Sequence, residues 1–265
     1  MLYFPQLDSG ASVQYPFVKR RIFRTVVNTL ADGSAAKLPD PGATMVAWEL
    51  QFASLSGSER AKLEGFFHAV EGRLGSFTLL DPTENLLLWS GDLNAGVWTA
   101  GPQLSVTGGV ADPEGGTSAT HLANAGAASQ SIAQSIEAPG WHCYCFSVYA
   151  RSSATGRLTL FRSAGGDEQA KECTVTSTWT RLMLTGAGQS TEESVVFGLR
   201  LAPGSSVDVY GLQAEAQPAP SAYRQTTSRN GIHAGARFDD DSLSMTSDGP
   251  EQHACTVHIV ARVAS

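Results

Sequence analysis

A single convincing amphipathic helix is predicted in this chain of 265 residues, and most of the remaining sequence alternates as β-strands do. The helix has one apolar stripe with the spacing i, i+3, i+4 and i+7. Its members are Leu63, Phe66, Phe67 and Val70. Ser56 and Glu59 have the spacing of a capping box at its start, and Gly72 is suited to end it. One helix among many short strands favours a mainly β fold.

Residues 1–90 are predicted to combine strands with this helix. The segment Val46–Phe52 alternates, so Val46, Trp48, Leu50 and Phe52 should share one face. Asp32-Gly33 is a tight-turn signal, Pro39–Gly42 indicates a loop, and Phe77–Leu80 indicates a further strand.

Residues 91–225 have a different character, because no helical stripe of similar quality is present. Short alternating strands recur between turns rich in Gly, Ser, Asp and Pro, which predicts an antiparallel β-sandwich. The strand candidates are 129–132, 143–150, 158–161, 179–184, 195–201 and 207–212.

Residues 226–265 contain one good strand, Cys255–Ala261, but are too few to build a core of their own. We therefore expect this strand to complete the first segment. The predicted organisation is an α+β core formed by 1–90 and 226–265, with the sandwich 91–225 inserted into it.

The charge balance disfavours several classes of function. The chain has 25 acidic and 18 basic residues, a formal net charge of -7, which argues against nucleic-acid binding and against anionic membrane surfaces. No apolar run approaches the ~20 residues that span a bilayer. The segment Met1–Pro5 does not resemble a secretory signal, so we expect synthesis in the cytoplasm of a host cell.

No catalytic motif stands out. The sequence contains no nucleophile elbow, zinc-protease motif or phosphate-binding loop, and no carboxylate pair is singled out as a glycosidase would require. The adjacent acids Asp167-Glu168 and Glu192-Glu193 are expected in loops. We therefore predict that the protein is not an enzyme and has no cofactor.

The four cysteines are Cys143, Cys145, Cys173 and Cys255. Strand spacing places Cys143 and Cys145 on one face, and their spacing does not match a zinc site. Small buried thiols are the favoured interpretation, while a bridge from Cys143 or Cys145 to Cys173 stays open.

The second segment resembles the jelly-roll carbohydrate-binding modules of glycan-degrading enzymes and phage tail proteins. The resemblance covers about half of the chain. It rests on Trp98, on 146–151, on 179–182, and on the ending Gln213-x-Glu215 followed by Ser221-x-Tyr223. It implies a jelly-roll sandwich in which Trp98 and Trp179 are core residues.

The flanking segments resemble the N-terminal core of phage distal tail proteins. The similar parts are Val46–Phe52, the helix between Ser56 and Gly72, the segment 77–82, and residues 236–260. The resemblance implies a split-barrel or β-sandwich core with one helix that forms a homohexameric ring in the tail tip or baseplate.

Glycan binding generally depends on aromatic side chains that stack on sugar rings, with polar neighbours for the hydroxyls. Core packing is an alternative role for each aromatic candidate. The candidates are Trp141, Tyr144, Tyr149, Arg151, Tyr210, Gln213 and Glu215. A structural calcium ion, as such jelly rolls often carry, could use Asp92, Asn94 or Asp208.

The resulting hypothesis is a structural protein of a phage or phage-derived tail tip, located in the virion tail. Its core would assemble with tail-tube and tail-tip proteins, and its sandwich would contact host-surface glycans. Predicted interface residues are Leu2, Tyr3, Phe4, Phe17, Lys19, Arg20, Arg21 and Arg24. The alternative is a monomeric bacterial carbohydrate-binding accessory protein.

Overall fold

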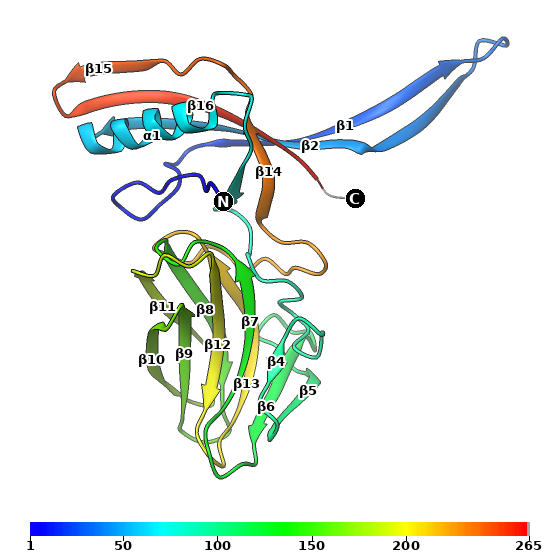
Figure 1. Ribbon diagram of the computed structural model, residues 1–265. Helices are drawn as coiled ribbons and strands as arrows, with labels where there is room; N and C mark the ends of the chain where they lie inside the picture. The colour runs from blue at the N-terminus through cyan, green and yellow to red at the C-terminus, as the bar shows by residue number, and fades with distance from the viewer. Residues whose placement is uncertain (264–265) are drawn as a thin grey trace. The chain divides into compact units, whose positions relative to one another are not determined.

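The computed structural model describes residues 1–263 and contains two compact units. Unit 1 comprises residues 1–8, 12–79 and the chain from 232 onward, and unit 2 comprises residues 9–11 and 80–231. The described chain is mainly β, with one helix and three antiparallel sheets (Figure 1). The boundaries near 79 and 231 lie about ten and six residues from the predicted ones at 90 and 225.

Unit 1 is built on one sheet with the strand order β1-β2-β16-β14-β3, and β15 pairs with β16. The long strands are β1 (Val18–Thr29), β2 (Ala35–Leu55) and β16 (Gln252–Arg262). The shorter strands are β3 (Phe77–Leu80), β14 (Ile232–Phe238) and β15 (Met245–Gly249). The sheet thus joins strands from both ends of the chain.

The pairing of β16 with β2 confirms that the last strand completes the first segment. Their register runs from His253 opposite Leu55 to Arg262 opposite Met45. The predicted alternation of β2 is also confirmed, because all four apolar residues on one face are buried. These are Val46, Trp48, Leu50 and Phe52, which pack with Val257 and Ile259 of β16.

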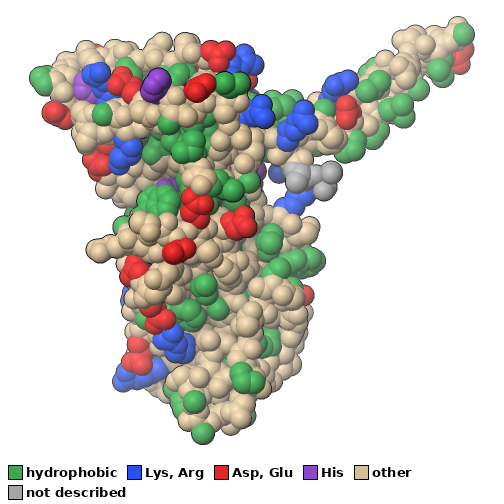
Figure 2. All heavy atoms as spheres, viewed as in Figure 1, with side chains coloured by type: hydrophobic (Ala, Val, Ile, Leu, Met, Phe, Trp, Pro, Cys, Tyr) green, Lys and Arg blue, Asp and Glu red, His purple; other side chains and the backbone are tan. Residues whose placement is uncertain are grey.

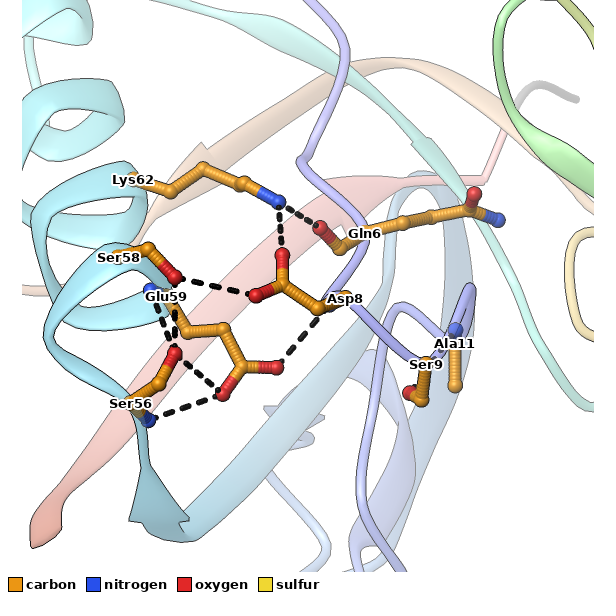
Figure 3. Close-up of polar contacts among 8 residues, drawn as sticks. All are labelled: Gln6, Asp8, Ser9, Ala11, Ser56, Ser58, Glu59 and Lys62. Carbon is orange, nitrogen blue, oxygen red and sulfur yellow. Dashed lines mark hydrogen bonds and ion pairs between the residues drawn. The ribbon is translucent and has the colours of Figure 1, made fainter. Parts of the chain in front are cut away.

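Helix α1 (Gly57–Val70) begins at the predicted capping box. Ser56 Oγ accepts from the Glu59 amide at 3.2 Å, and Glu59 Oε2 accepts from the Ser56 amide at 3.0 Å (Figure 3). Asp8 adds a second connection, since it accepts from Ser58 Oγ and Lys62 Nζ at 3.0 Å each (Figure 3). The helix ends with Glu71 and Gly72 in the left-handed region, as the glycine predicted.

The predicted interface residues near the N-terminus divide into two groups. Tyr3 and Phe4 are buried in unit 1, because backbone hydrogen bonds from Phe4 to Thr78 and from Thr78 to Leu2 fix this segment beside β3. They are therefore core residues of unit 1, and Phe17 also packs partly against this core. Leu2 is exposed, as are Arg20, Arg21 and Arg24 on β1, while Lys19 is half-buried with its ammonium 6.0 Å from the Trp48 ring centre.

The β1–β2 hairpin is longer than the sequence predicted. Asp32-Gly33 forms the expected turn, but the expected loop Pro39–Gly42 is part of β2, where Pro39 is paired with Thr25. Proline is tolerated in a strand whose amide side has no neighbour, and this stretch of β2 has a partner on one side only. The hairpin extends beyond the other strands of unit 1 (Figure 1).

Unit 2 is a jelly-roll β-sandwich of two five-stranded antiparallel sheets. One sheet has the order β10-β9-β12-β7-β4 and the other β11-β8-β13-β6-β5. The strands of the first are β4 (Thr99–Ala100), β7 (Gln130–Glu137), β9 (Gly156–Ala164), β10 (Asp167–Val175) and β12 (Ser194–Leu201). Those of the second are β5 (Leu104–Val110), β6 (Ala119–Asn124), β8 (Cys143–Arg151), β11 (Thr180–Ala187) and β13 (Ser206–Glu215).

The core of unit 2 lies between these sheets, where Phe197 contacts the rings of Tyr144 and Phe146. Asp167 and Glu168, expected in a loop, begin β10. All four cysteines lie within the described chain and none forms a disulfide, so the open bridge to Cys173 is not made. Among residues 1–263 no helix has the length and hydropathy needed to cross a membrane.

Candidate functional site

The outer face of the β11-β8-β13-β6-β5 sheet carries aromatic and charged side chains because successive residues of a strand point to opposite faces. On β8, Val148 and Ala150 are buried in the sandwich, so Tyr149 and Arg151 point outward. On β13, Val207 and Val209 are buried in the same way, so Asp208 and Tyr210 point outward. We call the patch formed by Tyr149, Arg151, Trp179, Arg181, Asp208, Tyr210, Tyr223 and His121 the outer-face cluster.

Three tyrosines form the aromatic part of the cluster. Tyr149 lies directly opposite Tyr210 in the register of β8 and β13, with ring centres 6.1 Å apart. The ring of Tyr223 meets that of Tyr210 edge-on at 5.2 Å. Gly211 has a positive φ of 66°, and a side chain there would begin 3.2 Å from the Tyr223 ring and 3.4 Å from the Tyr149 ring. Glycine is therefore favoured by the backbone conformation, and a larger residue would also be tightly confined by the two rings.

A row of charged groups runs beside the tyrosines. Arg151 Nε donates to Asp208 Oδ2 at 3.0 Å, and His121 Nδ1 lies 2.7 Å from Asp208 Oδ1. The Arg151 guanidinium also lies 4.8 Å from the centre of the Trp179 ring, a cation–π contact. The row places donors and acceptors next to the half-buried rings of Trp179 and Tyr149.

Arg181 joins the cluster to the segment that follows β13. Its Nη2 donates to Ser147 Oγ at 2.9 Å, its Nη1 donates to the Ser221 carbonyl, and its guanidinium lies 5.4 Å from the Tyr149 ring centre. Two further donors, Nε of Arg181 and Nε1 of Trp179, are buried without a hydrogen-bond partner within the described chain. Each unpaired donor costs ~1–3 kcal/mol unless water or a ligand oxygen accepts its hydrogen bond.

The loop 111–118 borders the cluster on the β5–β6 side. Asp112 organises it by accepting from the amides of Glu114, Gly116 and Ser118, each at 2.9 Å. These backbone hydrogen bonds, that of Ser118 foremost, hold the pKa of Asp112 below its usual value. Arg151 donates to the Ala111 carbonyl at 3.3 Å. Burial, together with a hydrogen bond to Glu114, raises the pKa of Tyr210. The loop is thus bound to the charged row and to the tyrosines.

Of the seven residues predicted for glycan binding, the structure brings Tyr149, Arg151 and Tyr210 together in this cluster. Trp141 is 42% exposed but lies in the turn before β8. Tyr144 points into the sandwich, where its hydroxyl donates to the Pro139 carbonyl at 2.8 Å. Tyr144 is a core residue because it falls on the inward-facing positions of β8.

Gln213 and Glu215 are buried beneath the segment 217–224. Gln213 Oε1 accepts from the Arg224 amide at 2.7 Å, and Glu215 Oε1 accepts from Ser221 Oγ at 2.5 Å and from its amide at 3.1 Å. The Gln-x-Glu and Ser-x-Tyr ending therefore holds this segment against the sheet, which brings Tyr223 to Tyr210. Both side chains position the cluster and leave no surface of their own open.

Sequence reasoning missed Trp179, Arg181, His121 and Tyr223 as members of the cluster. The signal for the first two was available, since Leu182 and Leu184 pair with Val148 and Phe146 and face the core. Alternation then places Trp179 and Arg181 outward. Trp179 was expected in the core, but it is half-buried on the outer face. Trp98 is buried, as the resemblance implied.

Two of the three residues considered for calcium, Asp92 and Asp208, have other side-chain partners. Asp92 Oδ1 accepts from the Asn94 amide at 3.0 Å, and Asp208 is bound by Arg151 and His121. Within residues 1–263, no three His, Cys, Asp or Glu side chains are grouped so that they could hold a metal ion.

No family model and no curated protein matches the sequence. Solved structures similar to this chain include TmCBM61 in complex with beta-1,4-galactotriose, at 16% identity and TM-score 0.38, covering 49% of this chain and 97% of that one. The CBM22-1 xylan-binding domain of Paenibacillus barcinonensis Xyn10C matches at 16% identity and TM-score 0.42, covering 52% of this chain and 99% of that one. The enzymatically active domain of bacteriophage CBA120 tailspike protein 4 matches at 12% identity and TM-score 0.40, covering 52% of this chain and 22% of that one. The likeness is one of β-sandwich fold and extends over about half of this chain.

Proposed function

We propose that unit 2 binds carbohydrate through the outer-face cluster. The observation that supports this is the meeting of the half-buried Tyr149 and Trp179 with the Arg151–Asp208–His121 row on one sheet face. Aromatic rings offer apolar surface to the C–H face of a sugar, while guanidinium, carboxylate and imidazole groups bind its hydroxyls. Trp179 Nε1 and Arg181 Nε supply two donors that a sugar oxygen could satisfy after a small side-chain shift.

Affinity electrophoresis on a panel of bacterial polysaccharides, followed by calorimetry with the best ligand, tests this proposal. Tyr149→Ala and Trp179→Ala should each weaken binding at least about tenfold, which corresponds to about 1.4 kcal/mol. Trp141→Ala is the matched control, because Trp141 is an exposed aromatic residue outside the cluster. Loss of binding in the Trp141 variant alone would contradict this proposal and would place the binding site at the turn before β8.

We propose for the whole chain a non-catalytic structural role in a phage or phage-derived tail tip, with unit 1 as the assembly core of a ring. The likeness of unit 2 to carbohydrate-binding modules supports the alternative, a carbohydrate-binding accessory protein, more directly. What supports assembly is the β1–β2 hairpin, whose apolar side chains are exposed to solvent in the single chain (Figure 2). Exposed apolar patches of this kind are typical of surfaces that contact another molecule.

Molar mass measured by light scattering separates the two candidates. A stable ring, expected to be a hexamer, or co-purification with tail-tube protein supports the tail role. A monomer at all concentrations that is still retained by a polysaccharide column supports the accessory protein. Turnover of a labelled polysaccharide would contradict the non-catalytic role in both.

A further inference from the structure

The outer part of the β1–β2 hairpin is a two-stranded ribbon. β16 accompanies β2 only as far as Met45, whereas β1 and β2 stay paired from Arg24 opposite Asp40 to Thr29 opposite Ala35. We call residues 18–44 the arm, and the other described residues of unit 1 the body. An isolated two-stranded hairpin is at best marginally stable in water.

The arm exposes apolar side chains on both of its faces. The exposed residues are Val18, Ile22, Phe23, Val26, Val27, Leu30 and Leu38, with Phe23 71% exposed. Both edges of the outer ribbon also leave backbone groups without a strand partner, a feature that natural proteins usually cover. These features together indicate that another surface covers the arm.

The charges of the arm and the body are of opposite sign. The arm has five basic residues and two acidic ones, a net charge of +3. The described body has five basic and ten acidic residues, a net charge of -5. A second copy of this chain therefore offers the arm a complementary partner, and opposite charges favour association in one orientation.

The body also contains a groove, lined by Tyr15, Pro16 and Phe52 together with polar serine, threonine, glutamine, aspartate and histidine side chains. It has a volume of about 640 Å³, and its lining includes Tyr15, Gln51, Asp240 and His258. Tyr15 is exposed at its rim, and Asp240 is an exposed acid. Within unit 1 the arm extends away from the body (Figure 1), so it does not cover this groove in its own copy.

We propose that the arm of one copy docks in the groove of a second copy, a head-to-tail contact that generates a ring if the rotation closes. Arg21 at the arm's root and Asp240 in the groove are its charged contacts, and Phe23 and Val27 its apolar ones. This inference rests on the proposed assembly role of unit 1 and specifies the surface that performs it.

The test is light scattering of the full chain over a concentration series, with circular dichroism to confirm folding. The double variant Phe23→Ser/Val27→Ser should weaken association at least about a hundredfold. Leu74→Ser is the matched control, since Leu74 is an apolar residue of the body with 74% exposure, and it should assemble as the unmodified chain does. Arg21→Glu should weaken association, and Asp240→Lys in the same chain should restore it.

The outcomes separate the inference from the role on which it rests. If the unmodified chain assembles and the arm variants assemble equally well, the arm is not the interface and the ring proposal survives. If the unmodified chain is a monomer at every concentration, both fail. If the arm variants dissociate but Asp240→Lys does not rescue Arg21→Glu, the groove is not the docking site.

Discussion

At the residue scale, Gly211 is the position on which the tyrosine arrangement most depends. Gly211→Ala should lower the free energy of unfolding by about 1–3 kcal/mol for two reasons. Alanine adopts the positive φ of this position only at an energetic cost, and its side chain would contact the rings of Tyr223 and Tyr149. Chemical denaturation measures the loss. Gly166→Ala is the control, since Gly166 has a positive φ but open space around it, and it should show the smaller loss. Equal losses would mean that the contact with the tyrosines has no effect.

Substitution of Glu215 tests whether the Gln-x-Glu and Ser-x-Tyr ending has a structural role in this chain. Its carboxylate is buried and accepts hydrogen bonds from the Ser221 amide and hydroxyl. Glu215→Ala should cost about 2–3 kcal/mol, because these donors lose a charged partner. Glu172→Ala, an exposed acid on β10, should be nearly neutral in the same denaturation experiment. A stable Glu215 variant with weakened glycan binding would instead assign this residue to ligand contact.

Some residues of the outer-face cluster could be predicted from the sequence and others could not, and the difference has a physical reason. Alternation along β8 and β13 is a local property, so Tyr149, Arg151 and Tyr210 could be predicted to share a face. Gln213 and Glu215 are buried because the segment 217–224 crosses that face. This covering is a feature of the tertiary structure and not of the local sequence. No local pattern reveals which part of an outer sheet face another segment covers.

At the element scale, α1 shows how far local rules reach. Its capping box, apolar stripe and final glycine could all be predicted from the sequence, because each depends on residues within one or two helical turns. Ser56→Ala should lower the free energy of unfolding by about 1 kcal/mol, since the Glu59 amide loses its acceptor. Ser228→Ala, an exposed serine in a turn, is the control for thermal denaturation. An unchanged melting temperature in the Ser56 variant would contradict a stabilising cap.

The arm was the element that local rules predicted least well. Two prolines and a glycine in 39–42 indicate a loop, and the sequence does not reveal that the neighbouring strand is missing on one side. Strands β4, β5 and β6 were also not predicted, because their segments contain few alternating apolar residues. By contrast, a size argument predicted that the last strand completes the first segment, since forty residues cannot bury a core alone; the structure adds that its partner is β2.

At the scale of the whole molecule, the two proposals are connected by multivalency. If unit 1 assembles into a ring, several copies of the outer-face cluster are presented together, and binding of one copy to a polymer raises the effective concentration of the others.

The full chain should then bind a long polysaccharide at least about a hundredfold more tightly than the Phe23→Ser/Val27→Ser variant. Both proteins should bind a short oligosaccharide of the same glycan equally well, because each single site is unchanged. Surface plasmon resonance on immobilised polysaccharide and calorimetry with the oligosaccharide measure the two affinities. A loss of oligosaccharide binding in the arm variant would show that the arm acts on the site itself, and equal polysaccharide affinities would show that assembly gives no avidity.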